Sequence, residues 1–363
     1  MARTLKPDWI LFLTTLALVL AGVVMVFSSS AVRAEQYFGD PNHFSLRHVV
    51  AACLGLAGMF GLMRVGYGAY RRPAVVLTLI AGVIALLCVA YLLPPVANTH
   101  RWIRLAGLSL QPSEFAKLGL VVFVAYYLSE RSARVNDWRF VLLPVGVVGI
   151  LTIGLVVFQP DLGTAILMAA VMGALLFVGG LHFGWMLAGG IPALLTAVAF
   201  VLFEPYRLRR LASFLDPSGD PLGAGFQLNQ SLISVGSGGI AGVGFMEGQQ
   251  KLFYLPEPHT DFIFAVIGEE LGLLGTFSIV VLLGVFAWRG LTSAFRAPDA
   301  FGCYLAVGIT LTIALQAAIH VGVVLGMLPT TGVPLPFLSH GGSSLLVTLA
   351  GVGILMNISQ HGH

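Results

Sequence analysis

Charge is scarce in this chain of 363 residues. Asp, Glu, Lys and Arg make up only 10% of it, against roughly 25% in a typical soluble domain. Hydrophobic residues make up 57%, and the mean hydropathy is +0.92. This combination excludes an ordinary soluble fold and predicts a protein that crosses a membrane several times. The net charge is only +3, so we expect no nucleic-acid partner.

Cysteine is scarce as well. Cys53, Cys88 and Cys303 all lie in apolar runs, which is typical of small hydrophobic residues and not of a disulfide framework or metal cluster. The sequence shows neither the glycine spacing of a dinucleotide site nor an internal repeat, so an inverted-repeat transporter has no support. The first apolar stretch lacks a convincing cleavage site, which predicts a spanning helix and not a signal peptide.

What the chain does have is long apolar stretches. A helix that spans a membrane needs about 20 such residues, so these stretches are candidate spans. The predicted spans are 9–28, 48–66, 74–94, 115–129, 140–158, 162–180, 183–203, 262–288, 301–326 and 341–358. We therefore expect an all-α polytopic membrane protein, a single domain over 1–363 with about ten transmembrane helices. A long extracytoplasmic loop, 204–261, would join helices seven and eight. The span at 115–129 is short, which leaves a tilted or broken helix open.

The basic residues of the short loops predict the orientation. With the N-terminus inside, ten Lys and Arg residues fall on the inner side and four on the outer side. The inner ones are Arg3, Lys6, Arg64, Arg71, Arg72, Arg131, Arg134, Arg139, Arg289 and Arg296, and the outer ones are Arg33, Arg47, Arg101 and Arg104. Both termini are therefore expected to be cytoplasmic.

The stretch "KLFYLPEPHTDFIF" places several ionisable groups directly before an apolar span. Its polar members are Lys251, Glu257, His259, Thr260 and Asp261. Asp261 would begin the eighth helix, where a capping role and a functional role are about equally plausible for an aspartate. The density of polar groups favours a functional site.

A second polar group precedes and enters the fourth span, in "HRWIRLAGLSLQPSEFAKLGL". Arg101 and Arg104 would lie in an outer loop, while Glu114 and Lys117 share a helix face at i, i+3. A solvated loop with one ion pair would explain them, but a lysine inside an apolar helix favours an interior cavity. In "QPDLGTA", Asp161 is interpreted as a helix cap.

Two more segments complete the outer face. "PTTGVPLPFLSHGGSS" carries Ser339, Gly341, Gly342 and Ser343, which could form a nest for an anion or sugar or merely a re-entrant turn. The basic run after the seventh span includes Arg210, which suits either phosphate binding or the anchoring of a surface helix. His320, alone in its span, is interpreted as structural. Together these residues predict an outward-facing site for a lipid-linked anionic substrate, or a transporter vestibule.

These segments resemble the SEDS family of cell-wall proteins over the whole chain. The motifs that carry the resemblance are "HRWIRLAGLSLQPSEFAKL", "QPDLGTA", "FLDPSGDPLGAGFQLNQSLISVGSGG", "KLFYLPEPHTDFIFAVIGEELGLLG" and "PTTGVPLPFLSHGGSS". The spellings "QKLFYLPE" and "GFQLNQSL" are closer to the division-type (FtsW) branch than to the elongation-type (RodA) branch. His340 stands where the family more often has tyrosine.

The resemblance implies a peptidoglycan glycosyltransferase in the bacterial cytoplasmic membrane that polymerises lipid II, with its active site outside. It places the general base on Asp261. The residues implied in substrate binding are Arg101, Arg104, Glu114, Lys117, Arg210, Lys251, Glu257, His259, Thr260, Ser339, Gly341, Gly342 and Ser343. It also implies a class B penicillin-binding protein (an FtsI-like transpeptidase) as partner, other divisome membrane proteins, and undecaprenyl-linked glycan as product. The resemblance fixes no cofactor. A divalent cation, Mg²⁺ or Mn²⁺, is compatible with a pyrophosphate leaving group, but no ligand cluster identifies one.

Three alternatives remain open at this stage. An elongation-type polymerase would share the chemistry and differ in cellular role. A lipid II flippase would need a path through the bilayer, whereas the polar motifs gather on one side. A scaffold that only recruits the crosslinking partner would keep its function without Asp261.

Overall fold

Helices dominate the computed structural model, which describes residues 7–95, 99–105, 108–216, 225–252 and 254–362. The helices are α1 (Trp9–Phe38), α2 (His43–Arg64), η1 (Tyr67–Arg71), α3 (Pro73–Leu92), α4 (Pro112–Glu130), η2 (Ser132–Arg134), η3 (Trp138–Leu142), α5 (Leu143–Phe158), α6 (Leu162–Val178), α7 (Phe183–Leu202), α8 (Pro205–Leu215), α9 (Phe226–Ser237), α10 (Ile263–Phe295), α11 (Ala300–Val324) and α12 (Gly342–His361). A two-stranded antiparallel hairpin, β1 (Ile103–Leu105) and β2 (Leu108–Leu110), precedes α4. The predicted all-α polytopic fold is confirmed.

Every one of the ten predicted spans is helical. Within the described residues, eight helical segments are long and apolar enough to cross a membrane. The apolar α6 has only 17 residues, and α4, which carries the buried Glu114 and Lys117, is not among the eight. The chain is thus an integral membrane protein, and the exact number of ten spans stays a prediction.

Two predicted boundaries were wrong. α1 continues ten residues beyond the expected end and stops at Phe38, where Gly39 adopts φ +67 and its N–H bonds the carbonyl of Glu35. α10 continues to Phe295 instead of ending near 288. In both cases the helix continues past the end of the predicted span, so the apolar run alone did not mark the end of the helix. The span at 115–129 is one unbroken helix, α4.

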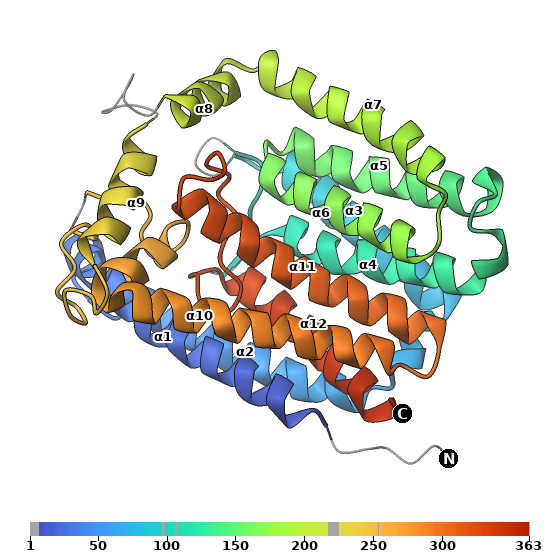
Figure 1. Ribbon diagram of the computed structural model, residues 1–363, viewed down its shortest axis with the longest axis horizontal. Helices are drawn as coiled ribbons and strands as arrows, with labels where there is room; N and C mark the ends of the chain where they lie inside the picture. Colours follow the sequence, from blue (N-terminus) through green and yellow to red (C-terminus); the bar gives the residue numbers. More distant parts are fainter. Residues whose placement is uncertain (1–6, 96–98, 106–107, 217–224, 253, 363) are drawn as a thin grey trace.

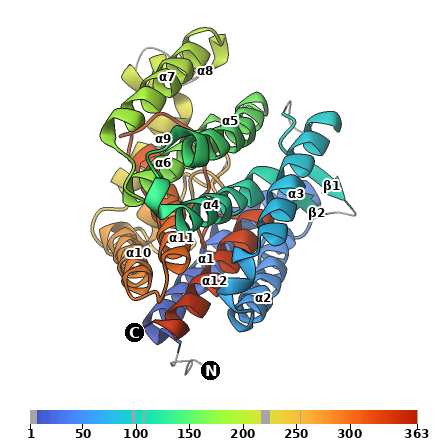
Figure 2. The same ribbon diagram turned by 90° about the vertical axis from the view of Figure 1, so that its right-hand side faces the viewer.

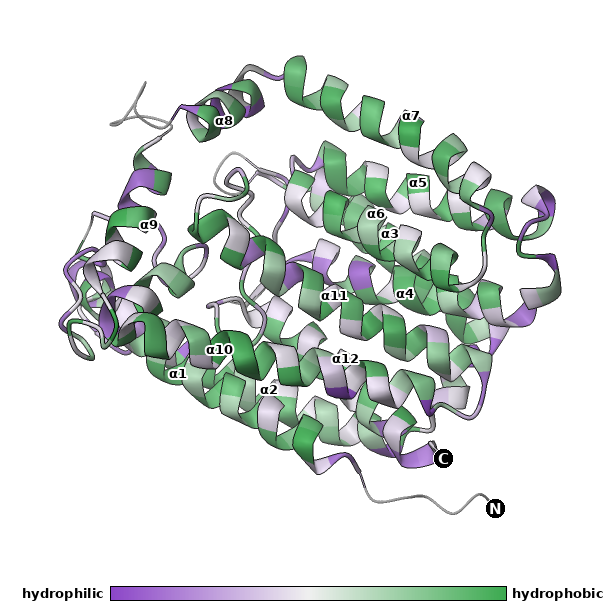
Figure 3. Cartoon of the chain, in the orientation of Figure 1, coloured by the Kyte–Doolittle hydropathy of each residue, from purple (hydrophilic) through white to green (hydrophobic). Residues whose placement is uncertain are grey.

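The helices run side by side along the long axis of the molecule (Figure 1). α11 and α12 lie in the interior, where α12 packs on α2 and α11 packs on α10, α4 and α6. Hydrophobic residues cover the middle of the bundle and hydrophilic ones gather toward its ends (Figure 3). α7 stands apart from the bundle (Figure 2), and none of its described residues is buried.

The two ends of the helix bundle carry different segments of the chain. Both termini lie at one end, while the segment 225–262 and the connection from α11 to α12 lie at the other (Figure 1). The predicted loop 204–261 includes α8 and α9 among its described residues, whereas 217–224 and 253 lie outside the described residues. The candidate site is at this loop end.

Candidate active site

The loop that precedes Asp261 is fixed to α10 by an exchange of backbone hydrogen bonds. α10 is interrupted at Gly272, which has φ +64 and ψ −158. At this break the carbonyls of Glu269 and Glu270 accept from the N–H groups of Val243 and Gly244, at 3.0 and 3.1 Å. A Cβ on Gly242 would overlap the carbonyl oxygen of Glu270. The glycine-rich stretch therefore brings backbone against backbone, which glycine permits because it has no Cβ.

Two buried carboxylates hold the same loop from the α10 side. Glu269 Oε1 accepts from the backbone N–H groups of Gln249 and Gln250, at 2.7 and 3.1 Å. Glu270 lies 2.6 Å from the ammonium group of Lys251 in a fully buried ion pair. A charge buried this deeply requires a close partner, and here the partner comes from the loop itself.

Lys251 was predicted to bind substrate, and its surroundings are now defined. Its ammonium donates to Glu270 Oε1, to Ser28 Oγ at 3.0 Å and to the carbonyl of Met246 at 3.0 Å. All three of its N–H bonds are therefore engaged, and a substrate contact would have to displace one of them.

The segment just before α10 is bound to the turn that precedes α12. Ser339 Oγ donates to the carbonyl of Thr260 at 2.6 Å, and the N–H of His340 donates to the carbonyl of His259 at 2.8 Å. The ring of His259 lies 4.7 Å from that of Phe44. Burial, with smaller contributions from His340 and Arg33, lowers the pKa of His259 to about 3, so this imidazole is neutral at physiological pH.

Asp261 is not the helix cap that its position suggested. The N-cap of α10 is Phe262, and no side-chain hydrogen bond caps the helix. Glu257, four residues earlier, adopts φ +47, and its carbonyl accepts from the N–H of Asp261 at 3.2 Å. The resulting turn leaves the partly buried Asp261 side chain available to the space beside it.

That space is a small pocket between α8, α9, α11 and the segment after α11. It is lined by Arg210, Gln227, Asp261, Phe262, Val323, Thr330, Thr331, Gly332 and Val333. The guanidinium of Arg210 donates to the carbonyl of Thr330 at 3.1 Å. A carboxylate and a guanidinium thus share one pocket at the loop end of an apolar bundle.

The electrostatics of this pocket favour proton acceptance by Asp261. Burial and then the neighbouring carboxylate of Glu257 raise the pKa of Asp261 to about 6, against the opposing effects of Arg210 and Arg101. A carboxylate with this pKa is still ionised at neutral pH and is a stronger base than an ordinary aspartate.

The other predicted cations lie in the hairpin region. Arg101 donates from Nε to the carbonyl of Gln159 at 2.9 Å, and its Nη2 contacts the carbonyl of Pro160. Arg104 is exposed on β1. Asp161 accepts from the N–H of Thr164 and is the N-cap of α6, as predicted.

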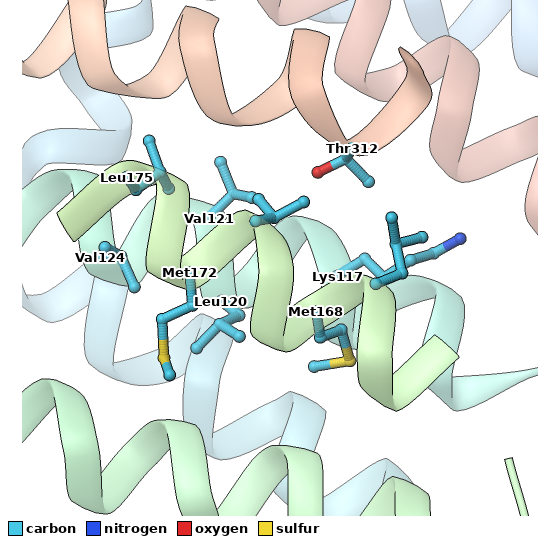
Figure 4. Close-up of a pocket in the computed structure, with 10 residues that line it drawn as sticks. Lys117, Leu120, Val121, Val124, Met168, Met172, Leu175 and Thr312 are labelled. Atoms are coloured by element: carbon cyan, nitrogen blue, oxygen red, sulfur yellow. The ribbon is translucent and has the colours of Figure 1, made fainter. Parts of the chain in front are cut away.

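Glu114 and Lys117, which were predicted to share a helix face, form an ion pair inside the bundle, away from the pocket of Asp261. The two side chains lie 2.8 Å apart and are almost completely buried. The Lys117 ammonium also donates to Gln316 Oε1 at 2.5 Å. Lys117 borders an apolar cavity between α4, α6 and α11, and its nitrogen points away from Val124 and Met172 (Figure 4).

The glycine and serine residues before α12 have defined places. Gly341 is the N-cap of α12, and a Cβ added to Gly342 would meet Ala51 on α2 at 3.9 Å. Ser343 is buried, and its Oγ accepts from the N–H of Gln111 at 3.3 Å. The structure thus brings Asp261, Glu257, His259, Thr260, Ser339 and Arg210 together, and it places Lys251, Glu114, Lys117 and Ser343 in other contacts.

Sequence reasoning missed three buried polar residues that support this region. They are Glu269 and Glu270 on α10 and Gln316 on α11, whose neighbour His320 was interpreted only as structural. The i, i+4 spacing of Gln316 and His320 in an apolar helix was an available signal, because it places both on one face. Within the described ranges, no three His, Cys, Asp or Glu side chains are grouped so that they could hold a metal ion.

Comparisons with known proteins identify the family of this chain. The chain matches the FtsW/RodA/SpoVE family, described as "Cell cycle protein", over residues 8–363. It is 42% identical to stage V sporulation protein E of Bacillus subtilis, with 98% of each chain covered. It is also 42% identical to a probable peptidoglycan glycosyltransferase FtsW of Trichlorobacter lovleyi, over 98% of this chain and 94% of that protein.

Solved structures share the fold. A chain from a structure described as "Structural coordination of polymerization and crosslinking by a peptidoglycan synthase complex" matches with a TM-score of 0.80 and 30% identity, over 98% of both chains. The rod shape determining protein RodA of Thermus thermophilus matches with a TM-score of 0.73 and 26% identity, over 99% of this chain and 98% of that one. By the match along almost its whole length, this chain belongs to the FtsW/RodA/SpoVE family of membrane proteins.

Proposed function

We propose that this peptidoglycan glycosyltransferase polymerises lipid II at the outer face of the bacterial cytoplasmic membrane, with Asp261 as general base. The observation that carries the proposal is the carboxylate of Asp261 beside Arg210 in one pocket, at the loop end of an apolar bundle. A lipid-linked sugar substrate requires this arrangement, because the lipid stays in the bilayer while the sugar reacts at its surface.

The chemistry follows from the substrate. The 4-hydroxyl of a GlcNAc unit forms a bond to the anomeric carbon of the growing strand, and the bond from that carbon to the pyrophosphate oxygen breaks. The α-linked donor gives a β-linked product, so the displacement inverts. The hydroxyl proton passes to the Asp261 carboxylate, and the negative charge leaves with the pyrophosphate.

Cations are expected to assist this departure, since pyrophosphate is already a fair leaving group. Arg210 lies in the pocket, and Arg101 is close enough to influence the charge of Asp261. We assign the pyrophosphate contacts to these two arginines, with Arg104 as an exposed outer contact. The residues described do not form a metal cluster, so a divalent ion in this proposal would arrive with the pyrophosphate, and no step depends on it.

The remaining predicted residues are proposed to contact the sugar or the anionic group of the substrate. Glu257, Thr260 and Ser339 lie in or next to the turn that carries Asp261 and are proposed to contact the sugar. Gly341 and Gly342 begin α12, whose first N–H groups suit an anion. His259 is neutral, so it would serve as a hydrogen-bonding group and not as a cation.

We further propose that both termini are cytoplasmic and that the pocket faces outward. The support is the charge of the short loops, together with the position of the termini at the end opposite the pocket (Figure 1). A cysteine in place of Ser109, which is exposed on β2, should react with a membrane-impermeant thiol reagent on intact spheroplasts. Labelling that appears only after permeabilisation would reverse the orientation. The control is the same protein with Cys53, Cys88 and Cys303 replaced.

A crosslinking partner is part of the proposal. The similar solved chain comes from a synthase complex that coordinates polymerisation and crosslinking, which supports a class B penicillin-binding protein as the partner here, together with other divisome membrane proteins. The relatives named FtsW and stage V sporulation protein E support a role in septum-type synthesis over one in elongation.

Polymerisation in detergent separates this function from lipid II transport. We expect the purified protein, mixed with lipid II in detergent micelles, to form glycan strands, with the partner added in a parallel reaction. Transport has no meaning without a bilayer, so polymer formed there cannot come from a flippase. Absence of polymer in both reactions, with a protein that unfolds cooperatively on heating, would contradict the proposed function. A scaffold would give the same negative result.

A further inference from the structure

One wall of the Asp261 pocket is a short segment without regular secondary structure. We call residues 330–334 the strap. Four of its residues, Thr330, Thr331, Gly332 and Val333, line the pocket together with Asp261. Gly332 has φ +71, and a Cβ placed on it would come within 3.5 Å of Asp261 Oδ2. The position of the strap therefore decides how closely Asp261 is covered.

The strap is held from the bundle side by two side chains of α11. His320 Nδ1 lies 2.9 Å from the carbonyl oxygen of Val333, and Gln316 Nε2 donates to the carbonyl of Pro334 at 2.9 Å. Both side chains are almost completely buried. They stand one helical turn apart, so α11 presents two adjacent donors to two adjacent carbonyls.

Each donor has only one possible orientation. A carbonyl oxygen can only accept, so His320 must carry its proton on Nδ1, and its buried Nε2 has no partner among the described residues. Gln316 Oε1 accepts from the ammonium of Lys117 at 2.5 Å. An ammonium can only donate, so the amide oxygen faces Lys117 and the amide nitrogen must face Pro334.

The buried ion pair of Glu114 and Lys117 thereby extends to the strap. Lys117 contacts Glu114 at 2.8 Å on one side and Gln316 on the other. Hydrogen bonds in a low-dielectric interior polarise one another, so the ammonium strengthens the bond from Gln316 to the strap. Glu114 and Lys117 therefore influence the pocket through Gln316 and the strap, although neither residue lines the pocket.

We propose that His320 and Gln316 are positioning residues, which hold the strap over Asp261 and so keep the pocket in its reactive form. The inference rests on the proposed function for its kinetic consequence, while its structural consequence is independent of any activity. Loss of either donor would leave the strap free to move from Asp261 and would admit water to the carboxylate.

The structural consequence can be measured by thiol labelling of the strap. The hydroxyl of Thr331 is fully buried, so a T331C thiol, in a protein without the three native cysteines, should react slowly. We expect H320F and Q316M to raise the labelling rate about tenfold each, because opening then breaks one buried hydrogen bond fewer. Unchanged labelling in both variants, at an unchanged melting temperature, would overturn the proposal.

Matched variants separate positioning from general damage. H320N places an amide nitrogen where Nδ1 stands and should keep labelling slow, whereas H320Q places it near Nε2 and should raise the rate. If H320F does not fold, the comparison of H320N with H320Q decides. Equal labelling rates of H320N and H320Q would contradict the proposal. T310V, at a buried α11 residue that faces Gly290 and not the strap, should leave labelling unchanged.

The kinetic consequence is a shift in the pH profile. The charged groups around Asp261 are Glu257 in its own loop, Arg210 on α8 and Arg101 before the hairpin. When water reaches the carboxylate, its pKa should fall toward that of an ordinary aspartate. We expect H320F and Q316M to lower kcat about tenfold and to move the acid limb of the polymerisation rate to lower pH. An unmoved acid limb would contradict positioning. If the wild-type protein forms no polymer, the proposed function fails, but the labelling result still decides the role of the strap.

Discussion

Replacing Asp261 with asparagine should lower the rate of lipid II polymerisation at least about a hundredfold. A general base contributes 10²–10⁴-fold to a rate, and an amide of the same size cannot accept the proton of the attacking hydroxyl. The side chain does not cap α10, so the variant should retain the wild-type melting temperature. The measurement is the initial rate of lipid II consumption, recorded with the melting curve of the same preparation.

The pH dependence of the polymerisation rate is a second test of Asp261 as the general base. Burial raises the pKa of Asp261 to about 6, and only the ionised form can act as a base. The wild-type rate should therefore be full above that pH and should fall as the pH drops through it. The residual activity of D261N should not show this fall in rate at low pH.

A neighbouring carboxylate provides the matched control. Glu257 is exposed and lies close enough to Asp261 to raise its pKa. Because Glu257 is proposed to contact the sugar, E257Q should lower the rate, but much less than D261N does. It should also shift the acid limb slightly to lower pH, because one repelling charge has gone. If E257Q loses activity as completely as D261N, the base has been assigned to the wrong residue.

Replacing Glu270 with glutamine should destabilise the protein by about 3–5 kcal/mol, the usual cost of leaving one member of a buried ion pair without its partner. Glu270 and Lys251 lie 2.6 Å apart and are fully buried. The same pair attaches the loop that leads to Asp261, so polymerisation should fall together with stability. Equilibrium unfolding in a fixed detergent measures the change.

The double variant tests whether the loss comes from the charge. In K251M/E270Q no charge remains, and the amide oxygen can still accept from the N–H of Met246, which bonds Glu270 at 3.1 Å. The double variant should be more stable than E270Q alone, as expected for coupled residues. The exposed pair of Arg71 and Glu130 is the control, and E130Q should cost less than about 1 kcal/mol. Equal losses for E270Q and E130Q would contradict this account of the buried pair.

Local features of the sequence predicted much of the fold. All ten apolar spans are helices, because their hydrophobic runs are long and their ends are marked by polar residues or proline. The cap at Asp161 and the shared helix face of Glu114 and Lys117 were predicted as well, since each depends on residues three positions apart.

The partners of the buried polar groups could not be predicted, because they come from distant parts of the chain. Ser28 bonds Glu270 across 242 positions, and Lys117 bonds Gln316 across 199. The helices α8 and α9 were hidden in a loop because they are short and carry polar residues. Asp261 was a candidate cap until the structure placed the cap at Phe262.

The central claim is that Asp261 accepts the proton in lipid II polymerisation. The most direct measurement is a side-by-side reaction of purified wild-type protein and D261N with lipid II in detergent at neutral pH, with glycan strands separated by length. We predict strands from the wild-type protein and at least about a hundredfold less from D261N, at equal melting temperatures. Near-normal strand formation by D261N would contradict the account.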